Sequence, residues 1–370
     1  MPKKTFSLVM AGGRGTRFWP ESTEKKPKQY LNLWGKESLL EQTLSRLIGL
    51  VSLKNTFVVT VQEQEKLAKK NIDQFVDDKN LIFEPLGRNT APCILLSLAH
   101  LLVNGASEND VVSIIPSDHV ILNKKGFQNT LKLAGMAAFQ NNEIITIGIR
   151  PHFPHTGYGY VERGEKKSLS SYETEETFES GEYFKVASFR EKPTKERAHE
   201  YLCSGRYFWN AGMFISKIGV LLEEFAAHAP ETYKFFSDLK RAIGEAKSTE
   251  AIYEKLPKES IDYAVMEKSK RVSVIPALFD WNDLGSWDAL EDVLKPEEGN
   301  TVVKDRGHYF KEAKGNIVFA PGKFVSLIGV NDLVVVSNEK VLMVVPKSDS
   351  QKVKGMVEDL KKKKTVHDLL

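Results

Sequence analysis

Short apolar runs and amphipathic segments alternate over the first 150 residues of the chain. The apolar, β-branched runs have the length of buried strands and cover residues 5–11, 57–61, 81–83, 111–115 and 144–149. Between them, apolar positions at helical spacing predict helices over residues 38–47, 62–75, 90–102 and 126–139. This alternation predicts an α/β fold in which a mostly parallel, Rossmann-like sheet is covered on both faces. Sheets of this kind bind ligands at the carboxyl ends of their strands.

The same alternation continues in the second half of this region. Strands are predicted at residues 183–189, 212–215 and 271–275, a helix at 195–203, and a longer helical region at 220–268. The stretch between Gly164 and Glu182 is rich in Ser, Thr and Glu, which predicts a solvent-exposed loop.

The pattern changes after Pro296, where short β-rich runs follow one another without helices. These runs are residues 316–320, 324–328, 333–337 and 341–345. Pro-Gly, Asn-Asp and Asn-Glu turn signals separate them, and a helix over about 350–362 closes the chain. We therefore predict two domains, a larger α/β domain over residues 1–296 and a small β-rich domain over residues 297–370.

Composition excludes several classes of protein. Of the 370 residues, 41% are hydrophobic and 27% are charged, which is typical of globular proteins and not of disordered chains. The net charge of +3 gives no sign of a bulk nucleic-acid binder, and the Lys361–Lys364 run is interpreted as a solvated helix end. Two cysteines, no apolar run of membrane-spanning length and no signal-peptide core predict a cytoplasmic protein without membrane association.

The first predicted strand leads directly into the glycine-rich loop, residues 11–17 (AGGRGTR). Its glycines allow backbone N–H groups to approach a ligand, and Arg14 and Arg17 suit bidentate contact with phosphate. The loop is not a Walker A motif, because no Gly-Lys-Ser/Thr follows, and Phe18 interrupts a dinucleotide fingerprint. By itself the loop is also compatible with an ordinary glycine-rich turn.

A second basic segment, Lys25-Lys26-Pro27-Lys28-Gln29-Tyr30, follows shortly after the loop. The two segments together, GGRGTRFWP and KPKQYL, resemble the signature of sugar nucleotidyltransferases and, more closely, of mannose-1-phosphate guanylyltransferases. Further motifs match that family in order: Glu84-Pro85 with residues 87–92 (GRNTAP), 116–119 (PSDH), 156–162 (TGYGYVE), 189–193 (FREKP), 209–214 (WNAGMF) and 281–287 (WNDLGSW).

The resemblance implies a reaction, a fold and partners. GMP would pass from GTP to mannose 1-phosphate, giving GDP-mannose and pyrophosphate, by in-line attack of the sugar phosphate on the α-phosphorus. Such a reaction needs alignment and neutralisation of charge more than a nucleophile. The family also implies a nucleotidyltransferase domain, a β-helix-like carboxyl-terminal domain and a homodimer formed through the β-rich region.

The family motifs assign roles to residues of this chain. Arg17, Lys28 and Lys192 are the expected catalytic residues: Arg17 for the β- and γ-phosphates, Lys28 for the α-phosphate and Lys192 for the sugar phosphate. The expected nucleotide-binding residues are Ala11, Gly12, Gly13, Gly15, Thr16, Arg17, Lys28, Asn89, Ser117 and Asp118. The expected sugar-binding residues are Gly157, Tyr158, Gly159, Glu191, Lys192 and Asn210.

A divalent cation is the implied cofactor. Asp118 and Asp283 are the expected metal ligands, since two carboxylates with phosphate oxygens and water make a site suited to Mg2+, with Mn2+ as the alternative. His119 is assigned a structural role, because the attacking phosphate is already ionised at neutral pH.

Other functions remain open at this point. A glucose-1-phosphate uridylyl- or thymidylyltransferase would keep the fold and the reaction, and a manno-heptose 1-phosphate would keep the nucleotide. A catalytically silent sensor of GDP-sugars would be expected to lack a phosphate-binding cation or a metal carboxylate. Arg17, Lys28, Asp118, Lys192 and Asp283 are all present, which favours an active enzyme.

Overall fold

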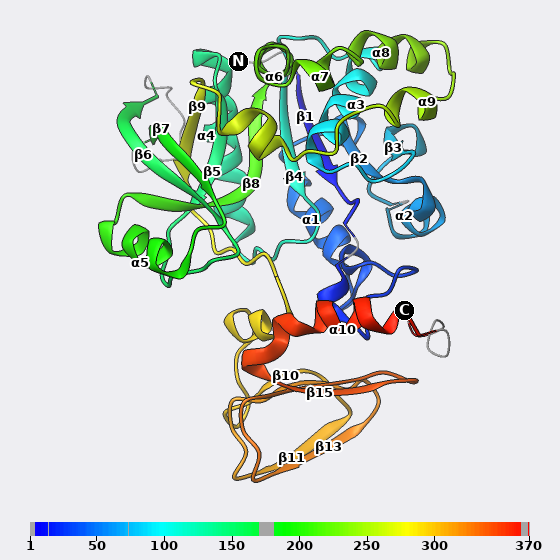
Figure 1. The fold of residues 1–370 in the computed structure, drawn as a ribbon, viewed down its shortest axis with the longest axis vertical. Helices are drawn as coiled ribbons and strands as arrows, with labels where there is room; N and C mark the ends of the chain where they lie inside the picture. The colour runs from blue at the N-terminus through cyan, green and yellow to red at the C-terminus, as the bar shows by residue number, and fades with distance from the viewer. Residues whose placement is uncertain (1–3, 14, 73, 170–180, 364–368, 370) are drawn as a thin grey trace.

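Most of the chain is built around one nine-stranded sheet (Figure 1). The computed structural model describes residues 4–13, 15–72, 74–169, 181–363 and 369. The strands are β1 (Thr5–Met10), β2 (Thr56–Val61), β3 (Leu81–Glu84), β4 (Val111–Pro116), β5 (Ile144–Ile149), β6 (Gly159–Ser168), β7 (Glu182–Glu191), β8 (Tyr207–Lys217) and β9 (Val272–Pro276). Their order is β3-β2-β1-β4-β8-β5-β9-β7-β6, and β6 also pairs with β8.

Most strands of this sheet point in the same direction. Neighbours in the β3-β2-β1-β4 block are parallel, and β5 is parallel to β9. Strand β8 runs antiparallel to both β4 and β5, so these two neighbours point the same way. Strands β6 and β7 form an antiparallel pair at one edge. The mostly parallel sheet expected from the sequence is confirmed.

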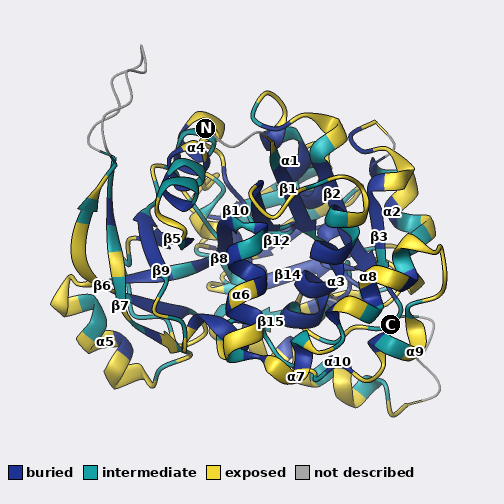
Figure 2. Ribbon diagram, turned by 90° about the horizontal axis from the view of Figure 1, so that it is seen from above, coloured by how far each residue is buried: buried dark blue, intermediate teal, exposed yellow. Residues whose placement is uncertain are grey.

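Helices cover both faces of the sheet. They are α1 (Leu39–Leu47), α2 (Glu65–Ile72), α3 (Thr90–Val103), α4 (Lys124–Asn141), α5 (Lys195–Ser204), α6 (Ile218–His228), α7 (Pro230–Tyr233), α8 (Phe236–Gly244) and α9 (Glu250–Tyr253), with a π-helical turn η6 (Asp262–Met266). Leu8 packs in one core with α3, α6 and α8, and the next residue, Val9, packs in the other core with α1, α2 and α4. The buried residues therefore lie along the strands, and the exposed residues lie on the outer sides of the helices (Figure 2).

Local signals place these elements well. Ser38 Oγ accepts from the Glu41 backbone N–H at 3.2 Å, and a Glu41 carboxylate oxygen accepts from the Ser38 N–H at 2.6 Å, so the predicted capping box is present.

No helix in the described ranges combines the length and the apolar character needed to cross a membrane.

Four sequence predictions are corrected by the structure. The predicted loop at 164–182 is in part a hairpin, because β6 extends to Ser168 and β7 begins at Glu182; residues 170–180 lie outside the described residues. The predicted helix at 62–75 is shorter, since a 3-10 turn precedes α2. The helical region at 220–268 divides into short helices, and β8 is longer than the predicted strand at 212–215.

The β-rich region after residue 300 forms parallel coils. Its strands are β10 (Thr301–Lys304), β11 (Gly307–Lys311), β12 (Ile317–Phe319), β13 (Phe324–Ile328), β14 (Leu333–Ser337) and β15 (Leu342–Pro346). Strands β10, β12 and β14 pair in parallel at Thr301, Ile317 and Val334, so one coil takes 317 − 301 = 16 residues and the next 334 − 317 = 17. At a corner, buried Asn316 donates to the Asn300 side chain at 2.9 Å.

The end of the described chain returns to the amino-terminal region. A 3-10 helix η8 (Lys347–Lys352) leads into α10 (Val353–Leu360), which replaces the longer helix predicted at 350–362. Figure 1 shows α10 between the β-coils and the first segments of the chain, and it contacts the 3-10 helix η1 (Thr16–Phe18). The two regions are therefore packed together, which places the coils close to the glycine-rich loop.

Candidate active site

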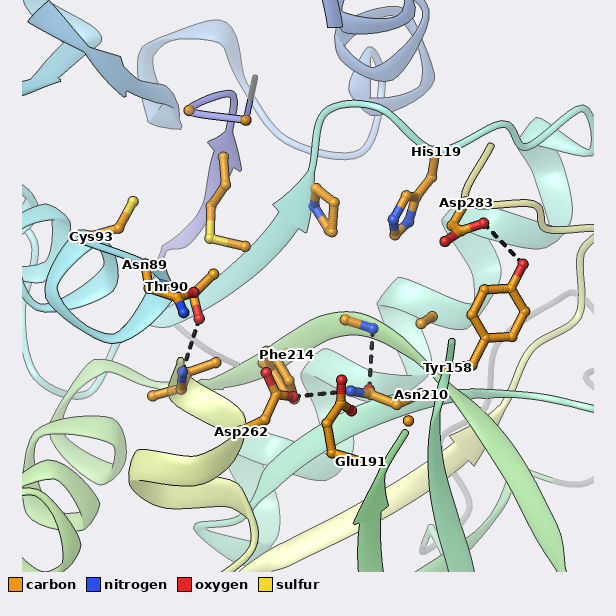
Figure 3. A pocket seen from close by; sticks show the side chains of 18 of the residues that line it. Asn89, Thr90, Cys93, His119, Tyr158, Glu191, Asn210, Phe214, Asp262 and Asp283 are labelled. Atoms are coloured by element: carbon orange, nitrogen blue, oxygen red, sulfur yellow. Dashed lines mark hydrogen bonds between the residues drawn. The ribbon is translucent and has the colours of Figure 1, made fainter. Parts of the chain in front are cut away.

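A cavity of about 440 Å³ opens at the carboxyl ends of the central strands (Figure 3). One end is lined by residues that follow β1 and β3, and we call it the glycine end: Gly12, Gly13, Glu84, Gly87, Asn89 and Thr90. The opposite end is lined by residues from β6, β7, β8 and η6, and we call it the carboxylate end: Gly159, Glu191, Asn210, Gly212 and Asp262. Tyr158, His119 and Asp283 line the cavity as well.

The glycine end is held by the side chain of Gln29. This buried amide donates to the Ala11 carbonyl at 2.5 Å and the Gly13 carbonyl at 2.9 Å, and it also donates to the Gln64 side chain at 3.1 Å. A Cβ atom added to Gly12 would lie 3.2 Å from a carboxylate oxygen of Glu84. The backbone beside Gly12 is therefore fixed and open to a ligand.

Gly15 determines where Lys28 lies. Its backbone is left-handed, with φ of 57°, and a Cβ atom at this position would lie 2.2 Å from the Lys28 Cβ. Only glycine adopts this conformation without strain, and only glycine leaves room for the lysine stem. The glycine-rich loop and the KPKQYL segment are therefore packed directly against each other.

Lys28 links the two segments that carry the predicted metal ligands. Its buried ammonium lies 2.8 Å from an Asp118 carboxylate oxygen and 2.6 Å from the Asp283 backbone oxygen. Burial raises the pKa of Asp118, but the charges of Lys28 and His119 together with hydrogen bonds to the carboxylate outweigh burial and hold that pKa below its usual range. Asp118 is therefore ionised at neutral pH.

Asp283 is oriented by Tyr158, whose hydroxyl donates to its Oδ1 at 2.9 Å. The tyrosine stacks on His155 with ring centroids 3.7 Å apart, and burial followed by the Asp283 charge raises the pKa of its hydroxyl. The hydroxyl therefore remains protonated and keeps donating to the Asp283 carboxylate.

The donor set around Lys28 fits a hard cation that arrives with phosphate. The Lys28 ammonium contacts a carboxylate oxygen of Asp118 and the backbone oxygen of Asp283, and the Asp283 side chain lines the cavity. Within the described residues no group of three or more His, Cys, Asp or Glu side chains surrounds a common point. Mg2+ is often held by one or two carboxylates with substrate phosphates and water, which is the arrangement that these residues allow.

The carboxylate end is an ordered set of polar side chains. Asn210 Oδ1 accepts from Thr146 Oγ1 at 2.9 Å and from the Gly212 N–H at 3.1 Å, and its Nδ2 donates to Asp262 Oδ1 at 3.1 Å. Asn210 therefore positions Asp262, and the carboxylates of Asp262 and Glu191 line the cavity at this end (Figure 3).

Asp262 and Glu191 influence each other electrostatically. Burial and then the nearby Glu191 charge raise the pKa of Asp262 to about 6. On the other side, a Cβ atom on Gly159 would lie 2.4 Å from a Glu191 carboxylate oxygen, so Gly159 leaves room for that carboxylate. The pair presents oxygen atoms to whatever occupies this end of the cavity.

Lys192 lies at the rim of the carboxylate end. Its backbone has a φ of 49°, its N–H donates to the Tyr158 carbonyl at 3.2 Å, and its ammonium lies 2.9 Å from Glu191 Oε1. The contact with Glu191 raises the pKa of Lys192. Its side chain is 63% exposed, so the ammonium is accessible to an anion that enters from solvent.

The remaining predicted residues lie around the cavity in different ways. Of the residues expected to bind ligands, those that line it are Gly12, Gly13, Asn89, Gly157, Tyr158, Gly159, Glu191, Asn210 and Asp283. The other expected residues do not line it: Ala11, Gly15, Thr16, Lys28, Ser117, Asp118 and Lys192. Arg17 is exposed and faces the Gly285 carbonyl at 3.5 Å, whereas Arg14 lies outside the described residues.

Sequence reasoning missed one carboxylate of the cavity, Asp262, and identified Glu84 as part of a family motif without counting it among the site residues. Glu84 is 4% exposed, accepts a hydrogen bond from the Tyr253 hydroxyl, and has its pKa raised by burial. Asp262 lies within a region predicted only as helical. The position of Glu84 at the end of an apolar strand was an available signal, whereas no local pattern distinguishes Asp262 from an exposed helical residue.

Comparison with known proteins defines the class. The family model described as nucleotidyl transferase matches residues 6–298, and a beta-helix domain described as mannoseP isomerase/GMP-like matches residues 311–360. The sheet with its glycine-rich loop and the β-coils are thus those of a nucleotidyltransferase with a β-helical module.

Individual relatives show to which family of nucleotidyltransferases the chain belongs. The chain is 37% identical over 361 residues to mannose-1-phosphate guanylyltransferase 2 of Escherichia coli O157:H7, covering 96% of this chain and 73% of that protein. It is 34% identical to the alginate biosynthesis protein AlgA of Pseudomonas aeruginosa, covering 95% and 71%. The crystal structure of a Thermus thermophilus protein described as mannose-1-phosphate geranyltransferase superposes with a TM-score of 0.86 at 34% identity, covering 97% and 99%. The chain belongs to the mannose-1-phosphate guanylyltransferase family.

Proposed function

We propose that this protein transfers GMP from GTP to α-D-mannose 1-phosphate, giving GDP-mannose and pyrophosphate. The observation that carries the proposal is the position of the Lys28 ammonium, 2.8 Å from Asp118 and 2.6 Å from the Asp283 backbone oxygen. This buried cation stands beside the cavity, close to the residues that separate its glycine end from its carboxylate end. An α-phosphate bound there would lie between the glycine end, where the nucleotide would bind, and the carboxylate end, where the sugar would bind.

The transfer is an in-line displacement at the α-phosphorus. A phosphate oxygen of the sugar phosphate forms the new O–P bond, and the bond between the α-phosphorus and the oxygen bridging to the β-phosphate breaks. Lys28 neutralises the charge that develops on the α-phosphate, and Arg17 is the residue that would meet the departing pyrophosphate. No proton has to be removed from the attacking oxygen, so His119, whose Nδ1 accepts from Trp281 Nε1 at 3.1 Å, keeps a structural role.

Asp118 and Asp283 are the residues that would hold Mg2+, or Mn2+ in its place. The ion would supply neutralisation of charge on the phosphate oxygens. Tyr158 holds the Asp283 carboxylate in one orientation through its 2.9 Å hydrogen bond, and Lys28 does the same for Asp118.

The glycine end supplies the features that would select guanine. Glu84 presents an acceptor beside Gly12, and the base would lie against the backbone of Gly12, Gly87 and Asn89. Guanine carries an N1–H and a 2-amino group that can donate to a carboxylate, and adenine lacks both of these donors on that edge. This arrangement supports GTP as the nucleotide.

The carboxylate end supplies the features that would bind the sugar. Glu191 and Asp262 accept from hydroxyl groups, Gly157 and Gly159 allow close approach, and Lys192 at the rim pairs with the 1-phosphate. The names of the E. coli and Pseudomonas relatives support mannose 1-phosphate as the acceptor substrate.

We further propose a homodimer, with a domain boundary between residues 296 and 297. The β-helical module carries exposed apolar side chains that would be covered by a second copy: Tyr309, Phe324, Ile328, Leu342 and Val344. Light scattering of the full chain should give twice the mass of 41.7 kDa. A monomer at micromolar concentration would contradict this part of the proposal.

The experiment is pyrophosphate release by the purified protein with Mg2+, with GTP, UTP, dTTP and ATP each combined with mannose, glucose and manno-heptose 1-phosphates. Release confined to GTP with mannose 1-phosphate is the expected result. If pyrophosphate is released with a different pair, the reaction type stands and the proposed substrates are wrong. If no combination releases pyrophosphate but the protein still binds GDP-mannose, the protein is a sensor of GDP-sugars and not an enzyme.

A further inference from the structure

The β-helical module shares a hydrophobic core with the two loops that carry the proposed catalytic groups. Phe18 and Trp19, next to the glycine-rich loop, pack with Leu284 and Trp287, which follow Asp283. The same core continues into the module through its strands and α10: Ile317, Phe319, Val334, Val336, Met343, Val353 and Val357. A module that served only to associate with another copy would not need this connection to the site.

Trp287 is the centre of this shared core. It is fully buried, and its ring lies 5.0 Å from the Phe18 ring on one side and 5.3 Å from the Phe319 ring of β12 on the other. The Lys28 ammonium lies 5.9 Å from the centre of the Phe18 ring. A continuous row of packed rings thus runs from the module to the lysine beside Asp118.

Hydrogen bonds and an ion pair hold the same segments together. Trp287 Nε1 donates to the Trp19 carbonyl at 3.1 Å, and Asn338, in the turn between β14 and β15, donates through Nδ2 to the Pro20 carbonyl at 3.2 Å. Lys361 pairs with Glu24 at 2.6 Å. Asn338 and Lys361, from two parts of the carboxyl-terminal region, and Trp287, which precedes this region, therefore hold residues 19–24.

We propose that the β-helical module is a positioning element of the catalytic site, acting within one chain through Trp287 and Asn338. By holding the 18–20 segment and the 284–287 segment together, it fixes the spacing between Lys28, Asp118 and Asp283. A displacement of about 1 Å between reacting groups can cost ~10²-fold in rate, so a support of this kind acts on turnover more than on substrate affinity. The measurement of kcat depends on the proposed nucleotidyl transfer, whereas the positioning role itself does not.

The test compares Asn338→Asp with Asn331→Asp. Asn338 Oδ1 accepts from the Lys340 and Val341 N–H groups, so aspartate keeps the turn but loses the donor to the Pro20 carbonyl. Asn331 is exposed in the same module, and its Oδ1 accepts from the Lys314 N–H, so aspartate keeps that contact. Trp287→Phe is a second variant, which retains a ring in the row and removes the donor to Trp19.

We expect Asn338→Asp and Trp287→Phe to lower kcat by ~3- to 10-fold, the range of one lost hydrogen bond, and to raise the Mg2+ concentration for half-maximal activity. KM for the sugar phosphate and the oligomeric state should stay unchanged, and Asn331→Asp should behave as the wild type. The proposal is overturned if both variants keep the wild-type kcat and the wild-type Mg2+ requirement. It is also overturned if a smaller folded fraction accounts for the whole loss of activity.

Hydrogen exchange gives a readout that does not depend on activity. Amides of residues 15–31 should exchange faster in Asn338→Asp than in Asn331→Asp. If the wild type releases no pyrophosphate, the proposed function fails, and this exchange difference still decides the positioning role: equal exchange in the two variants would refute it.

Discussion

The glycine end and the carboxylate end of the cavity are built from different kinds of structure. At the glycine end, parallel strands deliver backbone groups, and one buried amide, Gln29, fixes the turn after β1. At the carboxylate end, antiparallel strands and a π-helical turn deliver side chains, and Asn210 fixes Asp262. Backbone groups bind what all nucleotides share, whereas carboxylates distinguish patterns of hydroxyl groups. The common chemistry and the choice of sugar are therefore separable by mutation.

The largest effect is expected at the glycine end, from Gly15→Ala. The added methyl group would collide with Lys28 and displace it from Asp118, so we expect kcat/KM to fall by ~10²-fold or more. Gly322→Ala is the matched control, because Gly322 also has a positive φ, of 75°, with no atom within 4 Å of the added group. Gly322→Ala should lose only the stability that the positive φ costs, Gly15→Ala should lose more because of the collision, and only Gly15→Ala should lose activity per folded molecule in the pyrophosphate assay.

A similar or somewhat smaller effect is expected between the two ends, from Asp118→Asn. Removing the charge leaves the buried Lys28 ammonium without its carboxylate partner and weakens the proposed cation site. We expect kcat to fall by ~10²-fold, as for the loss of one preorganised group, with a higher half-saturating Mg2+ concentration. Chelation of divalent ions should abolish wild-type turnover. Full activity of the wild type in excess chelator would refute the role of the cation.

At the carboxylate end, Lys192→Ala should affect only one substrate. The ammonium is paired with Glu191 but exposed enough to meet a phosphate as well, so its loss should raise KM for the sugar 1-phosphate by ~10-fold or more, while KM for GTP changes less than twofold. Lys195→Ala, in the first turn of α5, serves as the control. An equal rise of both KM values would show that the two ends are not separable.

The smallest effect is expected from Asp262→Asn, and it is a change in pH dependence. Since the pKa of Asp262 is raised to about 6, the wild-type carboxylate gains its charge as the pH rises from 5 to 7 and becomes a stronger acceptor. KM for the sugar phosphate should fall over that range, and part of this fall should be missing in the variant. Glu191, Lys192 and Asn210 face this group in both proteins, and ionisation of the substrate phosphate is common to both. Identical KM profiles would exclude Asp262 from sugar binding.

The parts of the fold that sequence alone predicts are those fixed by neighbouring residues. The strand at 5–11 and the capping box of Ser38 and Glu41 depend on periodicity and on contacts three residues apart. Strand β6 was missed because its second half, from Arg163 to Lys167, is charged and largely exposed on a two-stranded edge. Periodicity gives no signal for a strand that buries neither face there.

The candidate site divides in the same way. The glycine-rich loop and the EKP segment are recognisable from contiguous residues, and the structure places both at the cavity or its rim. Asp262 is brought to Asn210 across 52 residues of sequence, and Lys28 to Asp283 across 255. Such pairs depend on the completed sheet, so no window of sequence contains them.

The contact between α10 and the first loops also concerns how the protein is made. Lys361 meets Glu24 across 337 residues, and Asn338 meets Pro20 across 318. At synthesis rates of about 5–20 residues per second, the ribosome needs roughly 15 to 70 s to emit the partners that hold residues 19–24. During that interval the nascent sheet already carries its glycine-rich loop without this support. On the proposed positioning role, a chain whose last tenth has not been released would therefore turn over more slowly than the finished protein.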